Sequence, residues 1–154
     1  MDVLPVLTGW VRGTLVGMVL GLVAVFTIAL WLNPYDDDGT PRRMETHTKL
    51  GLPPCTFKTV TGLPCPSCGM TTSFALLVRG DLGNSLRANF VGTLLALLWF
   101  ALIPWGIGSL ARGRPLFILS MERAATRLVI FFLTLLLLRW AIVLGMRWSQ
   151  AYHS

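Results

Sequence analysis

The sequence predicts an all-α membrane protein with three transmembrane helices, and two general observations support this prediction. The chain of 154 residues is 54% hydrophobic and 13% charged, about half the charged fraction of an ordinary soluble domain. Its apolar residues also fall in long blocks and do not alternate with polar residues as they would on a water-facing helix or strand. The length suits one domain, so we expect a single membrane domain over residues 1–154.

The first predicted span covers residues 13–32. No charge occurs between Arg12 and Asp36, and Trp10 and Trp31 bracket the stretch. At 1.5 Å per helical residue the two indoles lie about 30 Å apart, which matches a hydrocarbon core with aromatic residues at both faces. A cleaved signal peptide is the competing interpretation, but the apolar stretch is long for one and no small-x-small cleavage site follows it.

The second and third spans are predicted over residues 90–110 and 128–146. The second is uncharged throughout, and Pro104 is expected to kink it or to mark its last turns. The third is hydrophobic on every side, as lipid-facing helices are, and contains Arg139.

The longest polar section, residues 33–89, joins the first two spans. Within it, apolar residues from Met70 to Arg79 share one face of a short amphipathic helix that Gly80 ends. We expect this helix to lie at the bilayer interface. Asp81 is placed to cap a second short helix that leads into the second span.

Glycines recur at intervals of four along the first span, at Gly9, Gly13, Gly17 and Gly21. Such a ridge of small residues lets helix backbones approach closely, so we predict a packing seam against the other spans or another protein. The alternative is that glycine is simply common in membrane helices.

Arg139 places a positive charge inside the third predicted span. No Asp or Glu occurs in the three predicted spans, so no acidic counter-ion is available there. The side chain either snorkels toward Trp140 and the headgroups, or it contacts a partner subunit, a lipid phosphate or a cofactor carboxylate.

All three cysteines, Cys55, Cys65 and Cys68, lie in the loop between the first two spans, and three interpretations remain open. The loop is a structural unit in which Cys65 and Cys68 pack or form a disulfide. Alternatively, the three thiolates bind a metal such as zinc, with His47 as a fourth ligand. In the third interpretation Cys65 and Cys68 form a redox couple with Cys55 as a shuttle, although no βαβ pattern of a thioredoxin fold surrounds them.

The segment around the cysteines resembles a family of small bacterial membrane proteins catalogued as domain of unknown function 2752. The resemblance extends from Cys55 to about Leu98 and rests on an ordered motif: Cys55, Thr61-Gly62-Leu63-Pro64-Cys65-Pro66-Ser67-Cys68-Gly69-Met70-Thr71, Leu76-Leu77, Gly80-Asp81 and Asn89. It implies a small helical membrane protein and no particular reaction. The family usually has Arg where this chain has Thr72, and often Pro where it has Phe90. The first departure removes a cation beside the cysteine pair.

Several function classes are disfavoured by the residues present. The 13 Lys and Arg are scattered singly beside apolar spans, so their net charge of +6 does not indicate nucleic-acid binding. There is no paired-carboxylate motif, Ser/His/Asp grouping or phosphate loop, so no catalytic residues are predicted outside the redox alternative. We therefore expect a non-catalytic subunit or accessory protein of a larger membrane assembly, with a thiol–disulfide oxidoreductase and a metal-binding protein as alternatives.

Location follows from the spans and from the short loops. The bilayer is one expected partner, and a protein in a hetero-oligomeric membrane complex is another. The resemblance implies a bacterial inner membrane. Basic residues in the short second loop and before the first span place the N-terminus inside and the cysteine loop outside.

Overall fold

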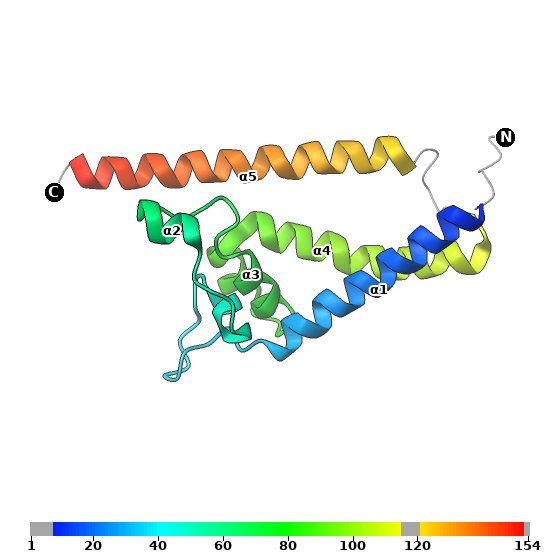
Figure 1. Cartoon of the computed structure of the whole chain (residues 1–154), viewed down its shortest axis with the longest axis horizontal. Helices are drawn as coiled ribbons and strands as arrows, with labels where there is room; N and C mark the ends of the chain where they lie inside the picture. The colour runs from blue at the N-terminus through cyan, green and yellow to red at the C-terminus, as the bar shows by residue number, and fades with distance from the viewer. Residues whose placement is uncertain (1–7, 115–120, 153–154) are drawn as a thin grey trace.

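The fold of a computed structural model, which describes residues 8–114 and 121–152, is helical throughout (Figure 1). Among these residues there is no strand, and one isolated bridge joins Tyr35 and Pro41. The elements are α1 (Gly9–Trp31), η1 (Thr46–Leu50), α2 (Thr56–Thr61), α3 (Met70–Leu77), α4 (Leu82–Arg112) and α5 (Met121–Tyr152). The predicted fold class is confirmed.

Three helices are long and apolar enough to cross a membrane. They are Gly9–Trp31, Leu82–Arg112 and Glu122–Met146. The predicted spans 13–32, 90–110 and 128–146 correspond to them in order. The chain therefore contacts the lipid bilayer through all three helices.

The core lies where the C-terminal half of α1 meets α3 and α4. Phe26 of α1 is at its centre, with its ring 5.9 Å from that of Phe74 and 5.8 Å from that of Phe100. Trp99 of α4 packs edge-on against Phe74 at 5.5 Å. Burial of Phe26 and Phe74, with Trp99 partly buried against them, gives α1, α3 and α4 a common apolar centre.

Helix α3 begins and ends close to its predicted limits, but its surroundings differ from the expected surface position. Its polar residues Thr72 and Ser73 are fully buried along with its apolar face. Thr72 Oγ1 lies 2.8 Å from the hydroxyl of Thr46 in η1, and Ser85 of α4 donates to the Ser73 carbonyl at 2.8 Å. The polar side of α3 therefore packs against other parts of the chain and does not face solvent.

Helix α4 consists of two helical pieces joined at Asn89. Asp81 caps the first piece, as predicted, and accepts a hydrogen bond from the backbone of Asn84 at 3.2 Å. The backbone angles of Asn89 are non-helical (φ −160°, ψ 101°), and the second piece then runs through Pro104 to Arg112. The break in helical geometry therefore comes directly before the predicted second span, 15 residues before Pro104.

Helix α5 runs alongside the rest of the molecule and has little packing of its own (Figure 1). None of the residues in its most apolar window is buried within the chain. Its exposed apolar side chains include Val129, Ile130 and Phe131, which suit contact with acyl chains.

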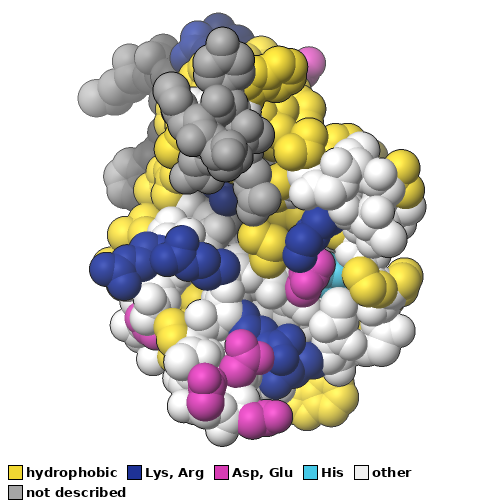
Figure 2. All heavy atoms as spheres, turned by 90° about the vertical axis from the view of Figure 1, so that its left-hand side faces the viewer, with side chains coloured by type: hydrophobic (Ala, Val, Ile, Leu, Met, Phe, Trp, Pro, Cys, Tyr) yellow, Lys and Arg dark blue, Asp and Glu magenta, His cyan; other side chains and the backbone are white. Residues whose placement is uncertain are grey.

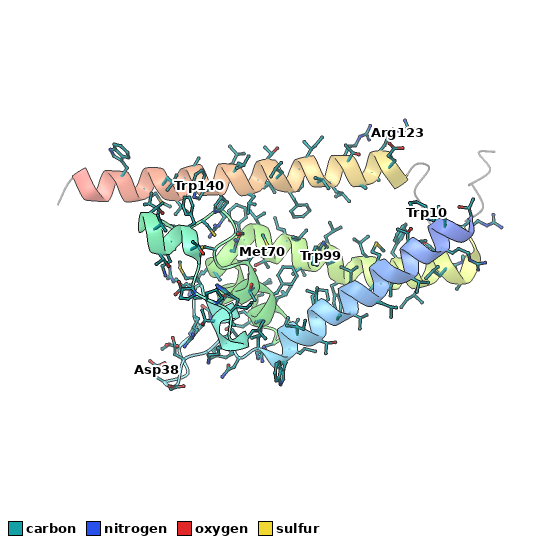
Figure 3. All side chains as sticks on the ribbon, viewed as in Figure 1. Trp10, Asp38, Met70, Trp99, Arg123 and Trp140 are labelled. Atoms are coloured by element: carbon teal, nitrogen blue, oxygen red, sulfur yellow. The ribbon has the colours of Figure 1, made fainter. Side chains whose placement is uncertain are left out.

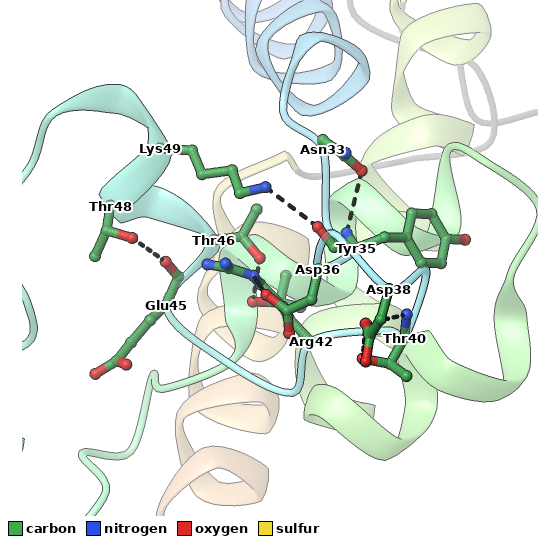
Figure 4. Close-up of polar contacts among 11 residues, drawn as sticks. Asn33, Tyr35, Asp36, Asp38, Thr40, Arg42, Glu45, Thr46, Thr48 and Lys49 are labelled. Carbon is green, nitrogen blue, oxygen red and sulfur yellow. Dashed lines mark hydrogen bonds and ion pairs between the residues drawn. The ribbon is translucent and has the colours of Figure 1, made fainter.

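The two ends of the molecule differ in polarity. The N-terminal end of α1 and the C-terminal end of α4 lie together, and the cysteine region lies at the opposite end (Figure 1). Charged side chains of both signs gather on that opposite end (Figure 2). Within it, Asp36 pairs with Arg42, Lys49 donates to the Tyr35 carbonyl at 3.2 Å, and other local hydrogen bonds close the loop on itself (Figure 4). This end therefore presents a polar, internally bonded surface.

Candidate functional site: a three-cysteine pocket

The three cysteine sulfurs come together in one pocket. All three thiols are free, and their Sγ atoms lie within 4.8 Å of one another. Cys65 and Cys68 are closest, with 2.9 Å between their sulfurs. Cys55 and Cys65 are partly exposed, whereas Cys68 is buried. The predicted grouping of the three cysteines is thus present in space as well as in sequence.

Two local structures bring the sulfurs into range. Cys55 is the residue that precedes α2, and its carbonyl accepts the backbone N–H of Thr59 at 2.9 Å. Cys65 and Cys68 form a tight turn in which the Cys68 N–H donates to the Cys65 carbonyl at 3.1 Å. The backbone N–H of Cys65 also donates to the Cys68 sulfur at 3.2 Å. The turn therefore directs both sulfurs to the same side of the chain.

Gly69 allows this turn to sit directly on α4. Its φ of 85° is in the left-handed region, which glycine occupies without steric cost. A Cβ at this position would lie 2.6 Å from the Ala88 carbonyl oxygen and 2.8 Å from that of Arg43. Both contacts are with backbone atoms, so only glycine fits between the cysteine turn and α4.

Asn89 fixes the same turn from the α4 side. It is fully buried, and its side-chain amide donates to the Cys68 carbonyl at 3.2 Å. Its Oδ1 accepts the backbone N–H of Gly92 at 3.1 Å and so caps the second piece of α4. One side chain thus holds the kink of α4 and the position of Cys68 together.

The two thiols of the turn differ in acidity. Desolvation raises the pKa of Cys68 to about 12, and its hydrogen bond to Cys65 adds to this effect. Desolvation also opposes ionisation of Cys65, but hydrogen bonds from the Cys68 thiol and the Ser67 hydroxyl outweigh it, so the pKa of Cys65 is lowered. When the turn holds one negative charge, it therefore resides on Cys65.

The remaining pocket lining is mixed, with the polar side chains of Ser67, Thr71 and Thr72 beside the apolar side chain of Met70. The pocket has a volume of about 310 Å³, and His47 and Glu45 line it together with the cysteines. The ring nitrogens of His47 are outside the group of ligand atoms that lie within 4.8 Å of one another. Glu45 is paired with Lys58 of α2 at 2.8 Å. The pocket therefore holds three sulfur donors at close range and His47 further out.

Arg139 reaches this site from α5. Its guanidinium donates to the Ala88 carbonyl at 3.1 Å and to the Pro66 carbonyl at 3.4 Å. The neighbouring Trp140 donates from its indole nitrogen to the Pro64 carbonyl at 2.9 Å and packs edge-on against Phe57. Trp140 lies on the side of α5 that faces α2 (Figure 3). The partners of Arg139 in the described residues are therefore backbone carbonyls of its own chain.

The glycine ridge is away from the other helices. A Cβ built at Gly9, Gly13, Gly17 or Gly21 would meet no other atom of the described chain within 4 Å. The face of α1 that packs on α4 contains Val19, whose side chain lies against Gly106, and Gly17 is about 200° around the helix from it. Packing of the ridge against the other described spans is therefore not observed.

Two site residues were not singled out from the sequence by their own chemistry, although both belong to the motif that suggested the resemblance. Gly69 has a visible signal, because a glycine directly after a Cys-x-x-Cys turn suits positive φ. Asn89 has a weaker one: a lone amide at the polar edge of an apolar stretch is placed to cap a helix.

Comparison with known proteins supports the resemblance over this segment. Residues 55–103 match the family model described as Protein of unknown function (DUF2752), which is about a third of the chain. This range includes all three cysteines, α3 and about the first two thirds of α4. Neither the curated proteins nor the solved structures contain a match to the chain.

Proposed function

We propose that this chain is a non-catalytic integral membrane protein, folded as one membrane domain, in which Cys55, Cys65 and Cys68 bind one soft metal ion that fixes the cysteine loop. The observation that supports the proposal is the convergence of the three sulfurs within 4.8 Å. Thiolates favour ions such as zinc and copper(I), and a tris-thiolate set leaves one position for a further ligand.

The geometry requires small adjustments for metal binding. Zinc–sulfur bonds of about 2.3 Å in a tetrahedral site hold sulfurs roughly 3.8 Å apart. The Cys65 and Cys68 sulfurs, at 2.9 Å, need to separate by less than about 1 Å. Cys55 is at the start of the short helix α2, so side-chain rotation at this position adjusts the distances from its sulfur to the other two. His47, which lines the pocket, is the candidate fourth ligand.

Metal content of the full-length protein tests the proposal. The protein is purified in mild detergent with reductant, loaded with zinc or cobalt(II), and its bound metal is measured by mass spectrometry. We expect one equivalent, with cobalt–thiolate charge-transfer absorbance, and loss of tight binding in each of Cys55→Ser, Cys65→Ser and Cys68→Ser. Ser67→Ala, in the same turn, serves as the matched control and retains the metal. Absence of bound metal, or equal binding by the serine variants, contradicts the proposal.

A thiol–disulfide function is the second candidate, and the close approach of Cys65 and Cys68 favours it. Oxidation of the two thiols would form one disulfide and release two electrons and two protons to an acceptor. The exposed sulfur has the lower pKa and the buried one the higher, an arrangement that suits an attacking and a resolving thiol. Thiol trapping in native membranes tests this candidate: a pair that stays reduced under every oxidant supplied is not a redox couple.

Participation in a larger membrane assembly is also part of the proposal. The open glycine ridge on α1 and the uncovered surface of α5 support it, because both leave room for another helix. Native mass measurement after gentle extraction tests it, and a lone monomer under all conditions counts against it. We further propose a bacterial inner-membrane location with the N-terminus inside and the cysteine loop outside, which cysteine labelling from each side of the membrane tests.

A further inference from the structure

We propose that the guanidinium of Arg139 is the counter-charge of the three-cysteine metal site and that it docks α5 onto the cysteine loop. This inference rests on the proposed metal function. It assigns a specific role to an arginine whose charge within a membrane span would otherwise be energetically unfavourable.

The first argument is the position of its hydrogen bonds. Pro66, whose carbonyl accepts from Arg139, lies between Cys65 and Cys68 in the chain. Its other acceptor, the Ala88 carbonyl, is the atom against which Gly69, the residue directly after Cys68, packs. An arginine that snorkels to the headgroups would leave the loop, whereas this one is bound to the backbone of the turn that holds two of the three sulfurs.

The second argument is that α4 supplies a free acceptor for it. In an uninterrupted helix the Gly92 N–H would bond to the Ala88 carbonyl. Here the Gly92 N–H donates to Asn89 Oδ1, and the Ala88 carbonyl accepts from Arg139 at 3.1 Å. The kink at Asn89 therefore exposes a carbonyl at the point where the guanidinium arrives.

The third argument is charge balance. A divalent ion with three thiolates has one net negative charge, which a single guanidinium neutralises. The predicted spans contain no acidic residue, and Glu122 lies in the first turn of α5, far along the helix from Arg139. A charge at the edge of a low-dielectric region is costly unless it is paired, so the metal–thiolate group and Arg139 stabilise each other.

The test compares cobalt(II) affinity of the full-length protein with three variants, using a chelator competition. Arg139→Gln removes the charge, and we expect it to weaken binding by about tenfold or more. Arg139→Lys keeps the charge, and we expect it to recover most of the lost affinity. Trp140→Phe removes the neighbouring indole–carbonyl hydrogen bond without changing charge, and we expect it to remain within about threefold of wild type.

The possible outcomes separate the two proposals. If wild type binds no cobalt, the metal function itself fails. If wild type binds and Arg139→Gln binds equally well, the counter-charge role of Arg139 is wrong and the metal function stands. Equal weakening in all three variants would mean that Arg139 acts only by holding α5 in place, which also overturns the inference. Should Arg139→Gln not yield monodisperse protein, Arg139→Met takes its place as the uncharged variant, and equal cobalt affinity in Arg139→Met and Arg139→Lys overturns the inference.

Discussion

Replacement of Asn89 by alanine probes the connection between the α4 kink and the cysteine turn. The substitution removes the cap on Gly92, a change that costs about 1 kcal/mol at a helix N-terminus. It also leaves the Cys68 carbonyl without the amide of Asn89 in a fully buried setting, which costs about 1–3 kcal/mol more. We therefore expect Asn89→Ala to lower the free energy of unfolding by about 2–4 kcal/mol.

Reversible unfolding by SDS in mixed micelles measures this change. Asn84→Ala is the matched control, because the side-chain amide of Asn84 also donates a hydrogen bond near a helix start, here to the carboxylate of Asp81, but Asn84 is only partly buried. We expect the control to cost less than about 1 kcal/mol. If the free energy of unfolding of Asn89→Ala is within about 0.5 kcal/mol of that of wild type, or of that of the control, then Asn89 does not hold the turn and the kink together as described.

Three further predictions concern the same end of the molecule. Gly69→Ala places a Cβ 2.6 Å from the Ala88 carbonyl oxygen at a residue with positive φ. We therefore expect the free energy of unfolding to fall by more than the roughly 1 kcal/mol that the backbone strain alone costs, and thermal denaturation in detergent measures this change. In metal-free protein, iodoacetamide should modify Cys65 before Cys68, because Cys65 is more exposed and has the lower pKa; mass mapping of peptides that reversed this order would contradict the assignment. Hydrogen bonds lower the pKa of Asp81 in the folded state, so its contribution to stability is present above the ordinary aspartate pKa and is lost as pH falls through the folded pKa. Asp81→Asn should therefore make the free energy of unfolding depend less steeply on pH in the acid range, and an unchanged dependence would rule out this contribution.

The spans were predictable because they depend on local composition. An uncharged stretch of membrane length has few other stable environments, and the flanking residues Trp10 and Trp31 added an independent length measure. The short helix from Met70 was likewise predictable from the spacing of its apolar residues, and Asp81 from its position before a helix. Each of these features depends only on the residues within about one helical turn or one span.

The contacts of the site were less predictable because they join distant residues. Helical periodicity assigns Thr72 and Ser73 to a solvent-facing side, but Thr72 bonds to the Thr46 hydroxyl of η1 and the Ser73 hydroxyl donates to the Met70 carbonyl within α3. The two carbonyl partners of Arg139 lie 73 and 51 residues away in the chain, and a backbone carbonyl leaves no trace in side-chain chemistry. The family usually has Arg at the position of Thr72. In this chain, Arg139 places a cation near the cysteine pair from a different helix.

The long sequence separation between the cysteine turn and Arg139 has a consequence for biogenesis. All three sulfurs, the kink and the glycine that fits against it are synthesised before α5 begins. A nascent chain that has inserted only α1 and α4 already has all three thiols, but it lacks the two carbonyl contacts from Arg139. Insertion of the last helix is therefore the step that adds Arg139 to the cysteine turn, and a chain truncated after α4 would retain every thiol while losing both of these contacts.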